Sequence, residues 1–215
     1  MGLPSFLAAM EQGLWCRVVY RHGTSNLETE LLCWPLELRR STMQGRSHLL
    51  FYEPEHRSLA SLRLEFIDAV YLYEDAVVRD GLGREAAELD ADIARAQAML
   101  PYVWGSSTGR TQAHNAAASP ALQEVALCIR CDAKEEPYIA RRLARECRGG
   151  RVTFDERAGT ATLRVTVCDA KEMRPWLRSF YGRILSCEGL EDVLAELDGL
   201  CGLDQVKKDV KSLIN

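Results

Sequence analysis

The sequence predicts an α+β protein: a small β-barrel or strongly bent sheet, then a ferredoxin-like β-α-β-β-α-β module, then a C-terminal helix. Two observations support this prediction. Short apolar runs separated by turn residues fill the first third of the chain, which is typical of a small all-strand unit. Farther along, helical spacing alternates with strand alternation in the order of a split β-α-β-β-α-β unit.

The first module is expected to open with a helix at residues 4–12, which Gly13 ends. Alternating apolar residues then predict a series of short strands, and Pro35 is expected to stop one of them. The predicted strands cover residues 16–21, 27–34, 36–40, 48–52, 62–67 and 70–73, with turns at residues 22–26 and 41–45.

Residues 84–100 change to a helical period, with Leu89, Ile93 and Ala96 on the apolar face and Asp92 among the charged residues elsewhere. Residues 105–120 follow with almost no apolar bulk, which predicts a flexible linker and a domain boundary.

The second module is expected to alternate strands and helices. A strand at residues 125–131 precedes a helix at 135–147, two strands at 151–156 and 160–168, a helix capped by Asp169, and a strand at 183–188. The predicted domains are a barrel at residues 1–80, a helix and linker at 81–121, the ferredoxin-like module at 122–190 and an amphipathic tail at 191–215.

The composition indicates a globular cytoplasmic protein. Hydrophobic residues make up 47% of the chain and no apolar run is long enough to cross a membrane. The net charge of −4 argues against unspecific coating of nucleic acid. Eight cysteines are spread along the chain, which favours reduced thiols, and Cys128 and Cys131 are interpreted as buried thiols rather than a metal site. No metal or other cofactor is predicted.

Residues 6 to about 75 resemble the WYL-domain family of bacterial regulators. The matching features are the strand that ends in Val18-Val19-Tyr20, the element Trp34-Pro35-Leu36-Glu37-Leu38, and the strand Leu62-Arg63-Leu64-Glu65-Phe66-Ile67. The motif that names the family falls on Ser47-His48-Leu49, so only its leucine is kept, and Phe66 replaces a second arginine. Residues 123–190 resemble the C-terminal extension that often follows this domain.

The resemblance implies an Sm- or SH3-like barrel that senses a negatively charged or nucleic-acid ligand and controls transcription or an attached effector. On this chain the implied anion pocket consists of Arg63, His48, Tyr20 and Arg39. The alternative is that Arg63 belongs to a solvated face, where Glu65 or Glu53 offsets its charge.

Residues 194–215 resemble the segment that leads into AAA+ ATPases of the CbxX and sporulation-stage-V type, through Gly202-Leu203, Val206-Lys207 and Val210. The resemblance implies an ATPase partner or fused domain, because no GxxxxGK[ST] phosphate loop occurs in these 215 residues. The alternative is an amphipathic tail helix that packs on the body or on a second subunit.

The sequence therefore favours a non-catalytic sensing module that binds an anionic ligand, either a nucleotide or single-stranded nucleic acid, and controls a transcriptional or ATPase partner. A homodimer held together by the second module is expected. The alternative function is a protein-interaction scaffold with a vestigial pocket. An enzyme is not predicted, since neither a zinc-protease HExxH motif nor a phosphate loop is present.

Overall fold

The computed structural model describes residues 2–21, 27–40, 45–109, 121–132 and 134–191. The chain forms two compact units, Met1–Ala121 and Leu122–Asn215, each with its own sheet. The predicted turn at 22–26, most of the predicted turn at 41–45, most of the predicted linker and nearly all of the predicted tail lie outside the described residues. Helices and strands are mixed in both units, which confirms the α+β class.

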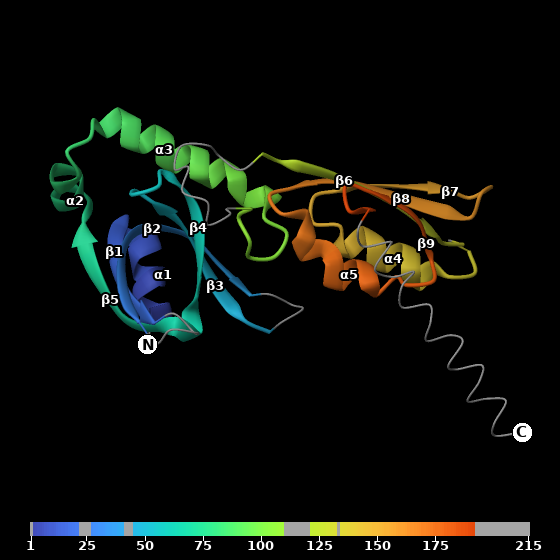
Figure 1. The fold of residues 1–215 in the computed structure, drawn as a ribbon, viewed down its shortest axis with the longest axis horizontal. Helices are drawn as coiled ribbons and strands as arrows, with labels where there is room; N and C mark the ends of the chain where they lie inside the picture. Colours follow the sequence, from blue (N-terminus) through green and yellow to red (C-terminus); the bar gives the residue numbers. More distant parts are fainter. Residues whose placement is uncertain (1, 22–26, 41–44, 110–120, 133, 192–215) are drawn as a thin grey trace, which may run out of the picture. The chain divides into compact units, whose positions relative to one another are not determined.

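The first unit contains a five-stranded antiparallel sheet with the strand order β4-β3-β2-β1-β5 (Figure 1). Its elements are α1 Gly2–Gln12, β1 Leu14–Arg21, β2 Glu28–Arg40, β3 Ser47–Glu53, β4 Ser58–Arg63, the 3-10 helix η1 Leu64–Phe66, β5 Ile67–Glu74, α2 Asp75–Leu82, α3 Ala86–Met99 and the 3-10 helix η2 Leu100–Tyr102. No helix in the described part of the chain has the length and apolarity needed to cross a bilayer.

The sheet is strongly curved, because only the three residues of η1 join β4 to β5, which occupy opposite edges. Helix α1 lies within this curve (Figure 1), and its Phe6 packs with Val18, Leu49 and Phe51 in a core from which water is excluded. Among the described residues β4 and β5 are not paired with each other, so the sheet is not the closed barrel that the sequence predicts.

Helices α2 and α3 cover the other face of the sheet. Trp15 lies on this face, because it alternates with the core residue Cys16, and its indole Nε1 donates a 2.9 Å hydrogen bond to Asp75 at the start of α2. The Trp15 ring contacts Trp34 and Tyr52 edge-on, at centroid distances of 5.3 and 6.3 Å. Both faces of the sheet are therefore buried, which explains why β3 is buried at nearly every position.

Two local predictions are wrong, and one helix was missed. Pro35 does not end a strand: β2 continues to Arg40, and the register with β3 shifts between Pro35 and Glu37, where a bulge tolerates the missing N–H. The predicted strand at residues 62–67 is interrupted by η1. Helix α2 was not predicted. It begins directly after β5, where the apolar pattern is too short to show a helical period.

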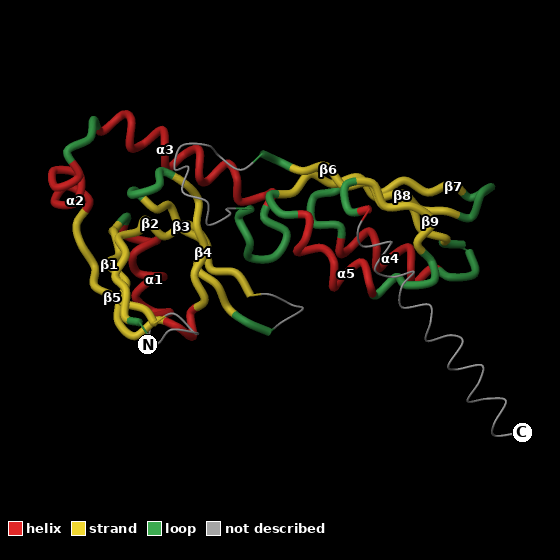
Figure 2. The backbone as a smooth tube through the Cα atoms, in the orientation of Figure 1, coloured by secondary structure: helices red, strands yellow, loops and turns green. Residues whose placement is uncertain are grey.

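The second unit is a four-stranded antiparallel sheet with the order β7-β8-β6-β9 (Figure 2). Its elements are β6 Gln123–Arg130, α4 Pro137–Glu146, β7 Arg151–Asp155, β8 Thr160–Val167, the 3-10 helix η3 Ala170–Met173, α5 Arg174–Arg178 and β9 Ile184–Glu188. Asp169 accepts a 3.0 Å hydrogen bond from the backbone N–H of Lys171, which confirms its predicted capping role. Helices α4 and α5 lie on one side of the sheet (Figure 1).

Candidate anion-binding site

Three of the four residues predicted for the pocket form one row across neighbouring strands. Arg39 of β2 lies opposite His48 of β3, and His48 lies opposite Arg63 of β4. Directly opposed residues in an antiparallel sheet point to the same face, so Arg39, His48 and Arg63 constitute a basic row on the face that α3 covers. The adjacent row, Leu38–Leu49–Leu62, belongs to the core around α1.

Tyr20 does not join this row. It lies on β1 and packs against the core around α1, on the opposite face of the sheet. Burial, with a smaller contribution from the charge of Glu53, raises the pKa of the Tyr20 phenol. The structure therefore separates Tyr20 from the other three predicted pocket residues.

The Arg39 guanidinium is occupied by contacts within the protein. It binds Glu37 through two hydrogen bonds of 2.8 and 2.9 Å. It also donates to the carbonyl oxygens of Val103 and Leu100, at 2.5 and 3.3 Å. These carbonyls follow the end of α3, so Arg39 fixes the chain where that helix stops. This coverage leaves His48 only 5% exposed.

Arg63, at the end of the edge strand, retains an unused donor. Its guanidinium lies over the Phe66 ring at 4.2 Å and pairs with Glu65 through Nη2. Within the described residues its Nε–H is buried and has no acceptor. Burial, followed by repulsion from Arg46, lowers the pKa of Arg63. The guanidinium is thus partly desolvated and only partly satisfied, a state that an anion would relieve.

Arg46 completes a positive corner beside Arg63. It is exposed, and in the part of the chain that the structure describes it pairs with no carboxylate. We refer to Arg46 and Arg63, with His48 behind them, as the Arg46–Arg63 corner. The sequence analysis did not select Arg46. The signal that could have found it is its position two residues before His48, because side chains two residues apart share a face in an extended chain.

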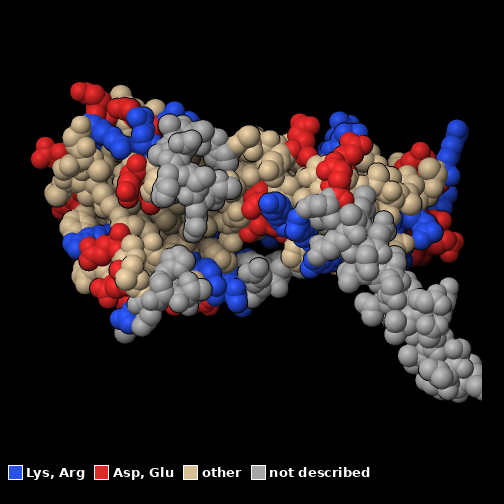
Figure 3. Space-filling view, in the orientation of Figure 1, with Lys and Arg blue, Asp and Glu red and all other residues tan. Residues whose placement is uncertain are grey.

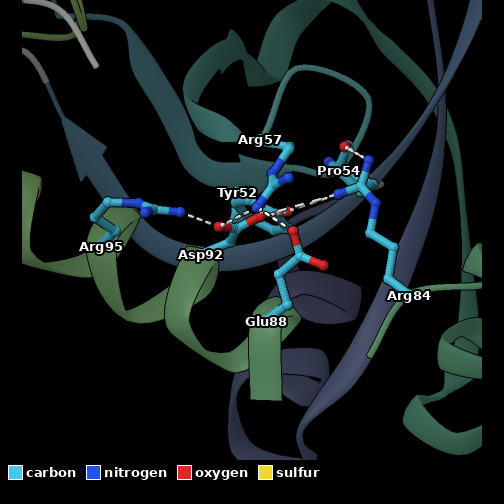
Figure 4. Close-up of polar contacts among 7 residues, drawn as sticks. All are labelled: Tyr52, Pro54, Arg57, Arg84, Glu88, Asp92 and Arg95. Carbon is cyan, nitrogen blue, oxygen red and sulfur yellow. Dashed lines mark hydrogen bonds and ion pairs between the residues drawn. The ribbon is translucent and has the colours of Figure 1, made fainter. Parts of the chain in front are cut away.

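A second polar cluster surrounds the carboxylate of Asp92 on α3 (Figure 4). Asp92 is 1% exposed, although the sequence analysis placed it on the charged face of the helix. Arg57 binds it through two hydrogen bonds, Tyr52 donates from its hydroxyl at 3.2 Å, and Arg95 forms a further ion pair. Arg84 lies 4.0 Å away and donates to the Tyr52 hydroxyl at 3.4 Å. The cluster joins α3 to β3 and to the β3–β4 turn.

The charges of this cluster satisfy one another. Burial acts to raise the pKa of Asp92, but hydrogen bonds and attraction from Arg57, together with the charge of Arg95, outweigh it, so the pKa is lowered. Burial and the nearby Asp92 charge raise the pKa of Tyr52 to about 12. Because Arg57 also pairs with Glu88 at 2.6 Å, its guanidinium is engaged by two carboxylates. The cluster therefore holds the fold together and is a poorer candidate for binding an anion than the Arg46–Arg63 corner.

Metal ligation has one candidate group in the described residues: Glu53, Glu55 and His56, whose ligand atoms all lie within 4.8 Å of one another. The His56 Nδ1 atom is 3.0 Å from a Glu53 carboxylate oxygen, an arrangement that an ion pair explains when the histidine is protonated. Cys128 and Cys131 belong to no such group among the described residues.

The segment Gly105–Gly109 reads G-S-S-T-G and so matches the G-x-S-x-G spacing of a nucleophilic serine, which the sequence analysis overlooked. Such a serine requires a strand before it and a helix after it. Here the 3-10 helix η2 precedes the segment, and the Ser107 hydroxyl accepts a 3.3 Å hydrogen bond from the backbone N–H of Gly109. This geometry is that of a tight loop rather than a catalytic turn.

On the face shown in Figure 3, basic and acidic side chains of the described residues are mixed, and no large patch of one sign is seen there. This distribution agrees with the net charge of −4. An anion would therefore be recognised by a local group of arginines rather than by the field of the whole molecule.

No family model and no curated protein matches the chain. Among solved structures, one described as a CRISPR Cas-related protein matches with a TM-score of 0.51 at 10% identity, over 95% of this chain and 52% of that one. Proteasome accessory factor B/C of Arthrobacter aurescens matches with a TM-score of 0.31 at 17% identity, over 92% of this chain and 26% of that one. This chain thus spans about half of the first protein and a quarter of the second. At such identities the first match shows a shared fold alone.

Proposed function

We propose that this protein is a non-catalytic regulatory module that binds an anionic ligand, a nucleotide or single-stranded nucleic acid, at the Arg46–Arg63 corner. The observation that carries the proposal is the unused, buried Nε–H of Arg63 beside Arg46. A phosphate oxygen placed there would accept that hydrogen bond and neutralise two arginines that repel each other.

Glu65 would act as the internal competitor of the ligand. It pairs with Arg63 and lies in η1, the link between β4 and β5. A bound phosphate that replaces Glu65 would release this constraint on η1, and β5 leads directly into α2. We infer that ligand binding is read out through this connection, as a shift between a state in which Glu65 pairs with Arg63 and a state in which Glu65 is released.

The barrel type, the type of the second module and the partner in this proposal are those that the WYL-domain resemblance implies. The strongly curved five-stranded sheet supports an Sm-like barrel that is open between β4 and β5, and the order β7-β8-β6-β9 supports a ferredoxin-like extension. Control of a transcriptional or ATPase partner is carried by the sequence resemblance alone, since residues 192–215 lie outside the described part of the chain.

The test is binding of a fluorescent single-stranded DNA, a matched RNA and ATP to the full chain at low salt. Arg63→Ala and Arg46→Ala should each weaken binding about tenfold. Each should also lower the slope of log K against log salt by about one, the value expected for the loss of one phosphate contact. Arg17→Ala is the matched control, because Arg17 is another sheet arginine but is engaged by Glu30. Glu65→Gln should strengthen binding. Failure of all three probes to bind, or equal binding by every variant, would refute the proposal.

A second candidate function is a protein-interaction scaffold with a vestigial pocket. The specific observations in its favour are that Arg39 is occupied by Glu37 and two carbonyls, that Tyr20 lies in the core, and that Arg63 already pairs with Glu65. The scaffold predicts that Glu65→Gln leaves every probe unbound, whereas the sensing module predicts tighter binding.

A further inference from the structure

In the second unit, no described helix covers one face of the β7-β8-β6-β9 sheet. Its inner face is apolar, since Leu127 and Leu163 are fully buried on the side where α4 and α5 lie. The residues that alternate with these therefore form the outer face. They are mostly small, and across the middle of the sheet lie Thr153, Thr162, Cys128 and Ser186 in one row.

The next row carries an unusual pattern of charge. Arg151 of β7 lies directly opposite Arg164 of β8. On the other side of Arg164, the row continues with Ala126 of β6 and ends with Glu188 of β9. Like charges directly opposite each other on a sheet are unfavourable unless something offsets them. In the described residues neither arginine has an ion-pair partner, and the same holds for Glu188.

The two signs are segregated across the sheet. The half made of β7 and β8 carries Arg151 and Arg164, and the half made of β6 and β9 carries Glu188 together with Glu124, which lies opposite Thr166 in the adjoining row. This part of the face is neutral overall, which disfavours a polyanion such as nucleic acid as its partner. Two positive residues on one half and two negative residues on the other make a surface that is complementary to itself.

The far end of the face carries charges that already have partners. Asp155 accepts hydrogen bonds from the backbone N–H groups of Arg157 and Ala158, both at 3.0 Å, and Arg130 donates to the carbonyl of Gly182 at 2.9 Å. The unpartnered charges are therefore concentrated in the rows of Arg164 and Glu124.

We propose that this outer face binds a second copy of the same face, related by a two-fold axis parallel to the strands. Such an axis exchanges β7 with β9 and β8 with β6, so Arg151 of one copy meets Glu188 of the other, and Arg164 approaches Glu124. The small side chains of the central row allow two sheets to approach to the usual spacing of about 10 Å. Four strands span only roughly 19 Å, so the interface is small and a micromolar dissociation constant is expected.

The test is sedimentation velocity of the full chain at concentrations from about 1 to about 300 μM. These concentrations bracket the expected dissociation constant. The wild type should be monomeric at the lowest concentration and dimeric at the highest. A negative variant, Arg151→Glu with Arg164→Glu, and a positive variant, Glu124→Arg with Glu188→Arg, should each dimerise at least tenfold more weakly, because like charges then face each other. An equal mixture of the two variants should restore the dimer.

Two further variants test whether weaker dimerisation results from the reversed charges or from unfolding of the variants. Arg151→Lys with Arg164→Lys keeps both charges and should keep the dimer, whereas Arg141→Glu changes an exposed arginine on the helix side and should have no effect. Recovery of the dimer in the mixture itself shows that both reversed variants are folded. A wild type that stays monomeric at the highest concentration would overturn the proposal, as would variants that dimerise normally or a mixture that stays monomeric.

Discussion

Arg57 donates two hydrogen bonds to the carboxylate of Asp92, from Nε to Oδ2 at 2.7 Å and from Nη2 to Oδ1 at 3.1 Å. This paired geometry joins the β3–β4 turn to α3 across 35 residues of sequence. Arg57 adopts a backbone φ of 54°, a left-handed conformation that is unfavourable for a side chain of this size. The bond to a buried carboxylate offsets that cost, and α3 is thereby fixed against the sheet.

Removing the Asp92 charge should strongly destabilise the first unit. Asp92→Asn removes the buried carboxylate that accepts hydrogen bonds from Arg57 and Tyr52, and we expect the free energy of unfolding to fall by about 1–3 kcal/mol. Asp90→Asn, on the same helix, removes an exposed partner of Arg79 and should cost less than about 1 kcal/mol. Urea denaturation of the two variants measures both values. Equal losses of stability in the two variants would show that the Arg57–Asp92 pair contributes no more than an exposed ion pair.

The same carboxylate should govern stability in acid. The pKa of Asp92 is lowered in the folded protein, so its contribution is present above the pKa of the unfolded chain and is lost as the pH falls through the folded value. Between pH 7 and about 2 the wild type should therefore lose more stability than Asp92→Asn. Thermal unfolding across this range tests the difference, and parallel curves for the two proteins would contradict it.

Tyr52 should control stability in alkali. Its pKa is raised to about 12, so the folded protein keeps the neutral phenol that the unfolded chain loses near pH 10. Stability is complete below pH 10 and is lost as the pH rises toward 12. Tyr52→Phe, which cannot ionise, should show a shallower loss in this window. Absorbance at about 295 nm measures ionised tyrosine during a titration with base. The difference between wild type and Tyr52→Phe should show one tyrosine that ionises above the usual pH of about 10.

Arg39 should behave as a structural residue, in contrast to Arg63. Arg39→Ala leaves Glu37 unpaired and deprives the carbonyls of Leu100 and Val103 of their donor, so we expect a loss of about 1–3 kcal/mol. Binding of an anion at the Arg46–Arg63 corner should change less than twofold. Chemical denaturation and anisotropy on the same samples separate the two effects, and a tenfold loss of binding without a change in stability would place Arg39 in the site.

Two glycines offer a matched pair for packing. A Cβ at Gly150 would lie 2.6 Å from Leu163 Cδ1 and 2.9 Å from the Cys147 carbonyl oxygen, so Gly150→Ala should destabilise the second unit by about 1–3 kcal/mol. A Cβ at Gly81, within α2, meets nothing within 4 Å. Gly81→Ala should therefore stabilise the first unit by about 0.5–1 kcal/mol. Opposite shifts in thermal midpoint are the expected result.

Local patterns predicted most of the regular structure, because they depend on spacing within a single segment. The alternation around Val18 and Leu49 and the helical period from Leu89 to Ala96 reflect which face of each element is buried. Alternation also placed Arg63 on the face opposite Leu62, as the structure has it. The interruption at η1 was missed, because a three-residue 3-10 helix leaves no period of its own.

The partners of the site residues could not be predicted in the same way. Arg39 meets carbonyls that are more than 60 residues away, at Leu100 and Val103, and Asp92 is buried because Arg57 and Tyr52 reach it from another element. A charged residue at a helix position carries no local signal that a distant arginine will neutralise it. The position of Tyr20 also depends on which face of the sheet α1 occupies.

By itself the sequence determined the class of the fold and the faces of most strands and helices, and a family resemblance made Arg39, His48 and Arg63 candidates. Only the tertiary structure decided which of these cations keeps an unused donor, because that depends on strand register and on which helix covers each face. Side-chain direction is a property of a few neighbouring residues, whereas satisfaction of a buried charge is a property of the whole packed unit.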